Sequence, residues 1–254
     1  MYNPFSLEGR TILVTGASSG IGRATAIECA LLGASVIVTA RNEERLRTVL
    51  ASLDTSAGQH HKMILADLDQ DGGVKSLIDQ VEDIDGLASN VGIAVGNIPI
   101  KFINDETIER VWEVNTFSHV RLIRELFKKK KLKKGSSVVI MASVGGTTAF
   151  NVGNSVYGMS KAALDSFMKF CAVDFSIRSI RCNSICPGMI ETPMNDGEGA
   201  LNEEDYKKDM DHYLLKRYGK PEEVAWATAF LLSDASSFIT GVSLLVDGGL
   251  SIIR

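Results

Sequence analysis

The chain has few cysteines and histidines, and they lack the spacings that mark disulfide-rich or metal-binding proteins. Its 254 residues include only four cysteines, which form no Cys-x-x-Cys pair: Cys29, Cys171, Cys182 and Cys186. The four histidines show no ligand-like grouping either, although two of them are adjacent. These spacings exclude a disulfide scaffold and the usual zinc sites. We therefore expect no metal, and free thiols in a reducing, cytoplasmic compartment.

Charge and hydropathy exclude two kinds of partner. The formal net charge is −4, which gives no reason to expect nucleic acid. No apolar run reaches the ~18 residues that span a bilayer, and the first ten residues lack the basic-then-apolar order of a secretory signal. Hydrophobic residues make up 45% of the chain, enough for a large core. We expect a small-molecule partner, with no nucleic acid and no membrane.

Apolar, β-branched runs alternate with helical patterns from one end of the sequence to the other. The strands expected from this alternation cover residues 11–15, 35–40, 62–66, 86–90, 137–142, 180–185 and 242–246. The expected helices cover residues 20–33, 43–53, 73–82, 105–130, 156–177 and 221–232. Such alternation predicts an α/β fold whose parallel sheet carries helices on both faces. No linker divides residues 1–254, so we expect a single domain, in which the polar segment 189–217 is a candidate cover for a site.

A glycine-rich turn joins the first expected strand to the first expected helix. Its spacing is Gly-x3-Gly-x-Gly, in the run Thr15-Gly16-Ala17-Ser18-Ser19-Gly20-Ile21-Gly22. Glycine lets a backbone approach a ligand closely, and a helix N-terminus presents free N–H groups to phosphate. A tight structural turn is the alternative, but the position between strand and helix predicts a dinucleotide site. Its contacts would come from Gly16, Ser18, Ser19, Gly20, Ile21 and Gly22.

The residues after the second strand bear on the choice between NADP(H) and NAD(H). An acidic residue there would bind the ribose of NAD, whereas an arginine would receive the 2′-phosphate of NADP. The chain has no acid at this place, and Arg41 follows the strand. We therefore favour NADP(H), with NAD(H) and an ordinary surface role for Arg41 as alternatives. Asp67 and Leu68 close the third strand, where they would face the adenine, although Asp67 is equally suited to cap a helix.

Tyr157 and Lys161 stand four residues apart in the expected helix 156–177. Residues at this spacing share one face of a helix, so the phenol and the ammonium can lie side by side. A positive charge beside a phenol favours the phenolate and lowers its pKa, which suits the tyrosine for proton transfer near neutral pH. Proton transfer beside a dinucleotide indicates redox chemistry between carbonyl and alcohol.

Along nearly its whole length the chain resembles the short-chain dehydrogenase/reductase family, and most of all its 3-oxoacyl-[acyl-carrier-protein] reductases. The glycine turn and the Tyr157–Lys161 pair carry the resemblance, together with Ser143, Asn115, Pro187-Gly188 and the run Val246-Asp247-Gly248-Gly249. One departure is Ser89-Asn90-Val91-Gly92, where the family usually has Asn-Asn-Ala-Gly. The resemblance implies a single-domain Rossmann-type, doubly wound sheet of about seven strands.

The resemblance also implies roles for the matched residues. Tyr157 would be the general acid, and Lys161 would hold down its pKa and bind the nicotinamide ribose. Ser143 would orient the carbonyl oxygen, and Asn115 would anchor a water that links Lys161 to solvent. Further cofactor contacts would come from Asn90, Gly92, Pro187, Gly188, Ile190 and Thr192. Taken singly, Ser143 could be a turn residue, Asn115 a satisfied helix residue and Tyr157 a packing residue.

The substrate clues are weaker. The expected walls are largely apolar, which fits an acyl chain or a ring, and they comprise Ser143, Val144, Phe150, Val152, Asn154, Tyr157, Gly188, Met189 and Met194. Relatives in fatty acid biosynthesis have basic residues for an acidic carrier near the places of Lys133, Lys134 and Arg178. The alternative for these lysines is a solvated helix end. Acids in the segment 189–217 argue against such a carrier docking nearby.

Three functions follow from these patterns. The first is an NAD(P)H-dependent oxidoreductase that reduces a carbonyl, with a 3-oxoacyl thioester, either free or linked to a carrier, as the leading substrate. The second is an alcohol dehydrogenase for a sugar, polyol or steroid. The third is a dinucleotide-binding regulator without catalysis, against which the intact Ser143–Tyr157–Lys161–Asn115 set argues. The family resemblance implies a homotetramer, with a dimer as the alternative.

Overall fold

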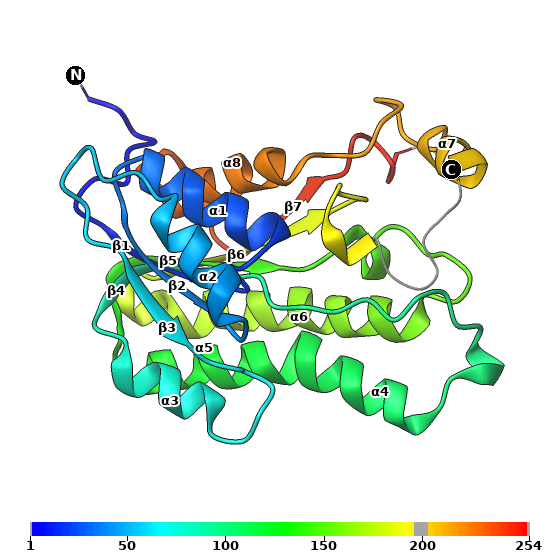
Figure 1. Ribbon diagram of the computed structural model, residues 1–254, viewed down its shortest axis with the longest axis horizontal. Coiled ribbons are helices and arrows are strands. Elements are labelled where there is room, and N and C mark those ends of the chain that lie inside the picture. Colours follow the sequence, from blue (N-terminus) through cyan, green and yellow to red (C-terminus); the bar gives the residue numbers. More distant parts are fainter. Residues whose placement is uncertain (1, 196–202, 253–254) are drawn as a thin grey trace.

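The computed structural model describes residues 2–195 and 203–252, which form one α/β layer structure (Figure 1). A sheet of seven parallel strands has the order β3-β2-β1-β4-β5-β6-β7, which confirms the predicted doubly wound architecture. Its strands are β1 (Thr11–Thr15), β2 (Ser35–Ala40), β3 (Lys62–Leu65), β4 (Ile84–Ser89), β5 (Leu132–Met141), β6 (Arg181–Pro187) and β7 (Ser243–Val246).

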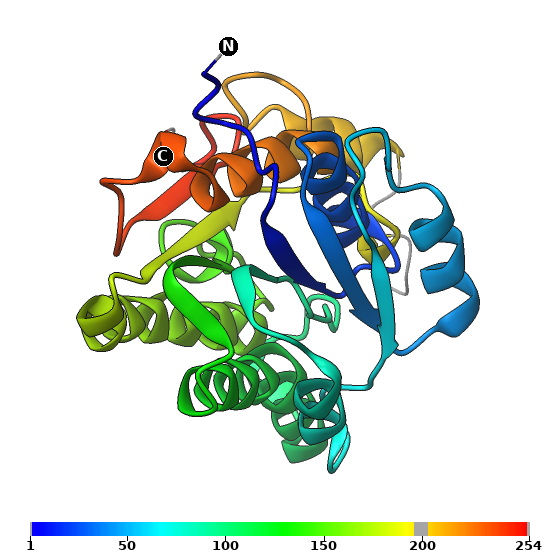
Figure 2. The ribbon, with the colours of Figure 1, turned by 90° about the vertical axis from the view of Figure 1, so that its left-hand side faces the viewer.

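Helices cover both faces of the sheet. The α-helices are α1 (Gly20–Leu31), α2 (Glu43–Ala51), α3 (Gly73–Gln80), α4 (Asp105–Trp112), α5 (Ser118–Lys128), α6 (Ser155–Asp174), α7 (Glu203–Met210) and α8 (Pro221–Leu232). Figures 1 and 2 show α1 and α8 on one face, and α3, α5 and α6 on the other. A π-helical turn, η2 (Glu113–Phe117), joins α4 to α5. The short 3₁₀ turns are η1 (Ile100–Phe102), η3 (Val144–Gly146), η4 (Phe175–Arg178), η5 (Pro193–Asn195) and η6 (Asp234–Ser236).

The two faces of the sheet bury separate apolar cores. Leu13, Leu122 and Leu164 lie in the core on the α5–α6 side, whereas Val38 and Leu231 lie in the core on the α1–α8 side. A strand that is buried on both faces needs apolar residues at consecutive positions rather than at alternate ones. This explains why β1 and β2 read as continuous β-branched runs.

The expected helix 105–130 is wrong in two respects. The π turn η2 interrupts it, and α5 ends at Lys128 because Lys130 adopts a left-handed conformation with a φ of 57°. The N–H of Lys131 then bonds the carbonyl of Leu126 at 2.9 Å, which is the pattern of a helix-ending Schellman turn. The fifth strand consequently begins at Leu132, five residues earlier than predicted.

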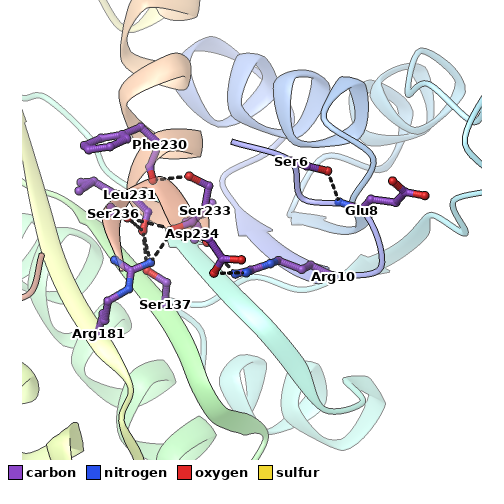
Figure 3. A network of polar contacts seen from close by, with 11 residues as sticks. Ser6, Glu8, Arg10, Ser137, Arg181, Phe230, Leu231, Ser233, Asp234 and Ser236 are labelled. Carbon is purple, nitrogen blue, oxygen red and sulfur yellow. Dashed lines mark hydrogen bonds and ion pairs between the residues drawn. The ribbon is translucent and has the colours of Figure 1, made fainter. Parts of the chain in front are cut away.

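Two arginines fasten the end of α8 to the sheet (Figure 3). Arg10 donates to the carbonyl of Leu232 at 3.1 Å and pairs with Asp234 at 2.6 Å. Arg181 donates to the carbonyl of Leu231 at 2.8 Å. Guanidinium groups satisfy carbonyls that a helix C-terminus leaves without partners and oppose its negative dipole end. The network therefore joins α8 to β6 and to the segment before β1.

The described part of the chain bears on the expectations about membranes, metal ions and cysteines. None of its helices combines the length and the apolar character that crossing a membrane would require. Within residues 2–195 and 203–252 there is also no group of three histidine, cysteine or acidic side chains placed to hold a metal ion. All four cysteines are free and buried.

Candidate active site

A cleft of about 1580 Å³ opens along the carboxyl ends of the strands. It is lined by the residues that the sequence assigned to cofactor or substrate, with the exceptions of Asn115 and Val152. On the cofactor side these are Gly16, Ser18, Ser19, Gly20, Ile21, Gly22, Arg41, Asp67, Leu68, Asn90, Gly92, Pro187, Gly188, Ile190 and Thr192. On the substrate side they are Ser143, Val144, Phe150, Asn154, Tyr157 and Met189, with Lys161 beneath them.

The glycine turn packs so closely that side chains cannot replace its glycines. A Cβ on Gly22 would lie 2.3 Å from the carbonyl oxygen of Gly16, which is closer than real Cβ contacts. Gly16 itself has a φ of 62°, a conformation that glycine adopts without strain. The turn thus brings β1 straight into the N-terminus of α1, whose N–H groups face the cleft as an anion site requires.

Two buried polar atoms along the cleft have no partner among the described residues. They are Oδ1 of Asn90 and Oγ1 of Thr39, and both residues line the cleft. The amide nitrogen of Asn90 is held by the carbonyls of Thr15 and Ala88, at 3.2 and 3.0 Å. Buried polar atoms normally bond something, so free acceptors beside a glycine turn fit a polar ligand. The residues present therefore fit a dinucleotide.

The end of the cleft beside β2 is basic. Arg41 and Arg45 both line it, while Glu43 in the same helix turn is paired with Arg47. The sequence interpretation identified Arg41 and missed Arg45. The sequence nevertheless contained a signal for Arg45. Asn42 is a typical N-cap residue that begins α2, and Arg45 lies one helical turn after Arg41.

Asp67 also lies in the cleft, but its carboxyl group has a neighbour that the sequence did not indicate. A hydrogen bond with Asp69, and then burial, raise the pKa of Asp67, while the charge of Arg41 acts in the opposite direction. Asp69 in turn forms an ion pair with Arg110 of α4. The residues after β3, which would face an adenine, are therefore linked to α4 by this ion pair.

Ser143 and Tyr157 are brought together by two glycines. A Cβ on Gly146 would lie 2.1 Å from the carbonyl oxygen of Gly158, so the turn after β5 rests directly on the first turn of α6. The hydroxyl oxygen of Ser143 accepts the N–H of Gly145 at 3.0 Å. The hydroxyl proton of Ser143 is then free for the phenol of Tyr157 or for a substrate.

The pKa of Tyr157 corrects one expectation. Burial raises it above the usual value for a phenol, and the hydrogen bond with Ser143 lowers it only in part. The Lys161 ammonium is 5.9 Å from the centre of the ring and donates to the carbonyl of Met141 at 2.9 Å. Lys161 was expected to lower the pKa of Tyr157, but the cost of desolvating a phenolate is larger. Tyr157 is therefore protonated at neutral pH.

Lys161 is itself perturbed by burial. Desolvation lowers the pKa of its ammonium to about 8, and it is 4% exposed. A buried lysine with this pKa keeps its charge at neutral pH and loses it in mildly alkaline solution.

Asn115 lies behind the cleft in the π turn η2 and is fully buried. Its Oδ1 accepts the N–H of Ile93 at 2.8 Å, and its Nδ2 donates to the carbonyl of Ile93 at 3.0 Å and to Ser160 at 3.2 Å. These bonds use both protons of the amide nitrogen and one of the two lone pairs of Oδ1, so they hold the side chain in one orientation. A π turn inside a longer helix often marks a functional position.

The substrate side of the cleft is apolar with a few polar groups. Phe150 forms its mouth and is 72% exposed, whereas Val152 is 85% exposed and does not line the cleft. The expectation that Val152 forms a wall is therefore wrong, because the turn at Gly153 carries it outward. Tyr213, which the sequence interpretation missed, is buried, and its hydroxyl accepts the N–H of Met189 at 3.0 Å.

The polar segment 189–217 lies partly outside the described residues. Of the acids in this segment, Asp196 and Glu198 lie outside the described residues. On either side of this stretch, Met194, His212 and Tyr213 line the cleft.

The basic residues considered for a carrier lie at the amino ends of β5 and β6, opposite the carboxyl ends that border the cleft. Lys133 is near the start of β5 and pairs with Asp85 at 2.8 Å, and Arg178 precedes β6. Lys133 lies in the irregular stretch of β5 between Leu132, which pairs with Ile84, and Ser137, which pairs with Gly86, whereas Met141 is at the carboxyl end of the same strand. The structure thus separates these cations from the cleft of the same protomer.

Comparison with known proteins gives a consistent result. Residues 16–251 match the family described as Enoyl-(Acyl carrier protein) reductase. The chain is 34% identical over 247 residues to the 3-oxoacyl-[acyl-carrier-protein] reductase FabG of Rickettsia prowazekii, covering 97% of this chain and 99% of the relative. The FabG of Thermotoga maritima is also 34% identical, over 250 residues, with coverage of 97% and 99%.

Solved structures share the fold over nearly the whole chain. A mutant short-chain dehydrogenase/reductase of Serratia marcescens superposes with a TM-score of 0.87 at 29% identity, over 98% of this chain and 100% of the other. A putative gluconate dehydrogenase from Agrobacterium tumefaciens gives a TM-score of 0.89 at 27% identity, over 100% of both chains.

Proposed function

The chain belongs to the short-chain dehydrogenase/reductase family, oxidoreductases of carbonyl and alcohol groups, and we propose that it reduces 3-oxoacyl thioesters with NADPH. The observation that carries the reaction class is the geometry at Ser143, whose hydroxyl accepts the N–H of Gly145 at 3.0 Å and keeps its own proton to donate, beside the phenol of Tyr157, whose pKa is raised by burial. A group with a raised pKa holds its proton until a stronger base forms next to it. A carbonyl oxygen that gains negative charge is such a base.

The proposed mechanism assigns one task to each residue. The bound cofactor supplies the hydride that attacks the carbonyl carbon. Ser143 donates its free hydroxyl proton in a hydrogen bond to the carbonyl oxygen and so stabilises the charge that develops there. Tyr157 transfers its proton to that oxygen. The charge of Lys161 stabilises the phenolate left behind, and the Asn115 turn holds the segment that lies against Lys161.

The preference for NADPH rests on the basic end of the cleft. Arg41 and Arg45 line the region beside β2, where the 2′-phosphate of the cofactor would lie. Glu43 is engaged by Arg47, and no acidic residue closes β2. Two guanidinium groups favour a phosphate dianion over a ribose hydroxyl pair.

The proposed substrate class rests on the relatives and on the mouth of the cleft. Two FabG proteins, each 34% identical, are named as reductases of 3-oxoacyl groups on a carrier protein. The mouth carries Phe150, and Ile98 beside it donates its N–H to the carbonyl of Gly153 at 2.9 Å. The neighbouring Ile100 and Phe102 are exposed. The apolar side chains of Ile98 and Phe150, which line the cleft, suit an aliphatic chain.

We also propose a homotetramer in a reducing, cytoplasmic compartment. Exposed apolar residues lie on α6 and η4, at Phe170, Val173 and Ile177, and others lie at Trp226 on α8 and at Phe238 after η6. Exposed apolar groups of this kind are typical of interfaces between copies. A carrier bound by Lys134 and Arg178 could then serve the cleft of a neighbouring subunit. Free, buried cysteines support the compartment.

One panel of substrates tests the proposal. NADPH consumption would be measured with 3-oxoacyl N-acetylcysteamine thioesters of four to twelve carbons, alongside sugars, polyols and steroid ketones. We expect kcat/KM to rise with chain length, by up to about fourfold for each methylene that the mouth buries. Turnover of a sugar or polyol with no turnover of any thioester would establish the second function instead. NADPH binding without turnover of any compound would favour the regulator.

A further inference from the structure

His119 is a buried histidine that the mechanism above does not use. It lies in α5 one turn after Asn115 and is 1% exposed. Its Nε2 is 2.7 Å from the carbonyl oxygen of Val91, and its Nδ1 is 2.7 Å from the hydroxyl of Ser89. Both partners belong to the segment that leaves β4 and enters the cleft.

The partners of His119 determine which nitrogen carries the proton. The carbonyl of Val91 can only accept, so Nε2 must donate to it. Burial, and then the charge of Lys161, lower the pKa of His119 to about 3, so the ring is neutral. Nδ1 therefore accepts, and the hydroxyl of Ser89 donates to it. The imidazole acts as a fixed bridge between a donor and an acceptor.

His119 and Asn115 hold the same short segment at two points. Asn115 binds both main-chain polar groups of Ile93, and His119 binds Val91 two residues earlier. Helix residues four apart are about 6 Å apart along the axis, and two residues of extended chain span about 6.6 Å. Because these two lengths match, one face of the helix can hydrogen-bond alternate residues of the segment, Val91 and Ile93.

Gly92 lies between the two points, and the space beside its Cα is bounded by Lys161. A Cβ on Gly92 would lie 3.3 Å from Nζ of Lys161 and 3.5 Å from Oδ1 of Asn115. Any shift of the segment toward the helix or away from it would therefore change the packing against Lys161. On its other side the segment is held separately, through the contacts of Asn90 with Thr15.

We propose that His119 is a positioning residue, which through the Nε2–H···Val91 bond keeps the segment 91–93 in place against Lys161 and Asn115. The departure from the family pattern supports it. The family usually has asparagine at the place of Ser89, and the shorter serine here donates to Nδ1 of the imidazole. Ser89 and His119 thus form a matched pair, of which the histidine contacts the catalytic segment.

Two substitutions of His119 distinguish the loss of the Nε2–H donor from the loss of the volume of the imidazole ring. In His119→Gln the amide nitrogen can reach the place of Nε2 and donate to Val91. In His119→Asn the shorter amide can accept from Ser89 but cannot reach Val91. We expect the Asn variant to lower kcat about tenfold with the thioester KM changed less than twofold, and the Gln variant to retain kcat within threefold.

A measurement that does not depend on turnover accompanies the kinetics, because the kinetic part rests on the proposed function. Amide hydrogen exchange at Ile93 reports the bond that Asn115 makes to the segment. We expect exchange about tenfold faster in His119→Asn, near wild-type exchange in His119→Gln, and NADPH affinity within threefold in both. If no thioester is reduced by the wild type, the reaction assignment fails while this measurement still decides the role of His119.

Ser118→Ala is the matched control. Ser118 is buried on the same helix turn, and its hydroxyl bonds the carbonyl of Val114 within the helix rather than the segment. It should change the melting temperature but not the Ile93 exchange or kcat. Wild-type kcat and exchange in His119→Asn, or equal losses in the Gln and Asn variants, would overturn the proposal in favour of simple packing.

Discussion

The hydroxyl oxygen of Ser143 accepts the N–H of Gly145 at 3.0 Å, and this bond leaves the serine with one proton to give. The phenol of Tyr157 lies beside it with a raised pKa. The site therefore holds two hydroxyl groups that can both donate to one oxygen. Such an arrangement is built for an oxygen that becomes negative, which is the situation during carbonyl reduction.

Replacing Tyr157 with phenylalanine should separate catalysis from binding. The ring and its packing remain, and only the transferable proton is lost, so we expect kcat to fall about 10³-fold. NADPH affinity, measured by fluorescence enhancement, should change less than threefold. Surviving turnover within tenfold of the wild type would remove Tyr157 from the proton-transfer step.

The pH dependence should follow Lys161. Its pKa is lowered to about 8, so the free protein loses the ammonium charge as pH rises through that value. Tyr157, whose pKa is raised, stays protonated over the same range. We expect kcat/KM for NADPH, which reports the free protein, to be constant below pH 7 and to fall up to tenfold per unit above about pH 8.

Lys161→Arg provides the check on this assignment. A guanidinium keeps its charge at any pH in the assay, so the alkaline fall should disappear even if the rate is lower throughout. A wild-type profile that stays flat to pH 9.5, or a fall that persists unchanged in the arginine variant, would assign the titration to another group.

Cofactor preference should depend on two arginines. We expect Arg41→Ala and Arg45→Ala each to weaken NADPH binding about five- to tenfold, and the double variant more than either, with NADH binding nearly unchanged. Binding of 2′,5′-ADP compared with 5′-AMP, followed by calorimetry, measures the same contact without catalysis. Arg47→Ala is the matched control, because Arg47 pairs with Glu43 and does not line the cleft. Equal losses for NADPH and NADH would place the 2′-phosphate elsewhere.

The strands and the cofactor end of the cleft could be predicted because local patterns determine them. Continuous β-branched runs indicate strands that are buried on both faces, as in β1 and β2. Gly16 and Gly22 are visible because close backbone approach permits only glycine. In each case the physical requirement acts on neighbouring residues, so the sequence records it.

The rest of the site depends on contacts between distant segments. The π turn at Asn115 interrupts a helical pattern that continues unbroken in the sequence, so periodicity could not reveal it. The histidines show no ligand grouping, and only the fold brings His119 to Ser89 and Val91. The pKa of Tyr157 was predicted in the wrong direction because spacing shows the nearby charge but not the degree of burial.

Asp165 should matter for stability, because it joins the helix that carries Tyr157 to two strands. It is buried on α6, and its Oδ1 accepts the hydroxyls of Ser184 on β6 and Ser243 on β7, each at 2.6 Å. Its Oδ2 accepts Lys169 at 2.9 Å. Burial acts to raise the pKa of Asp165, but the three hydrogen bonds outweigh it and hold the pKa below the usual value.

The lowered pKa fixes the sign of the pH effect. A carboxyl group whose folded pKa is below its unfolded one stabilises the fold above the unfolded pKa, and this contribution is lost as pH falls through the folded pKa. We expect Asp165→Asn to lower the free energy of unfolding in urea at pH 7 by about 2 kcal/mol. The difference between the variant and the wild type should shrink below pH 4. Asp174→Asn, at the exposed end of α6, should change stability by less than about 0.5 kcal/mol. Equal effects of the two substitutions at pH 7 would mean that the buried carboxylate does not hold α6 to the sheet, and that its serine partners are satisfied in another way.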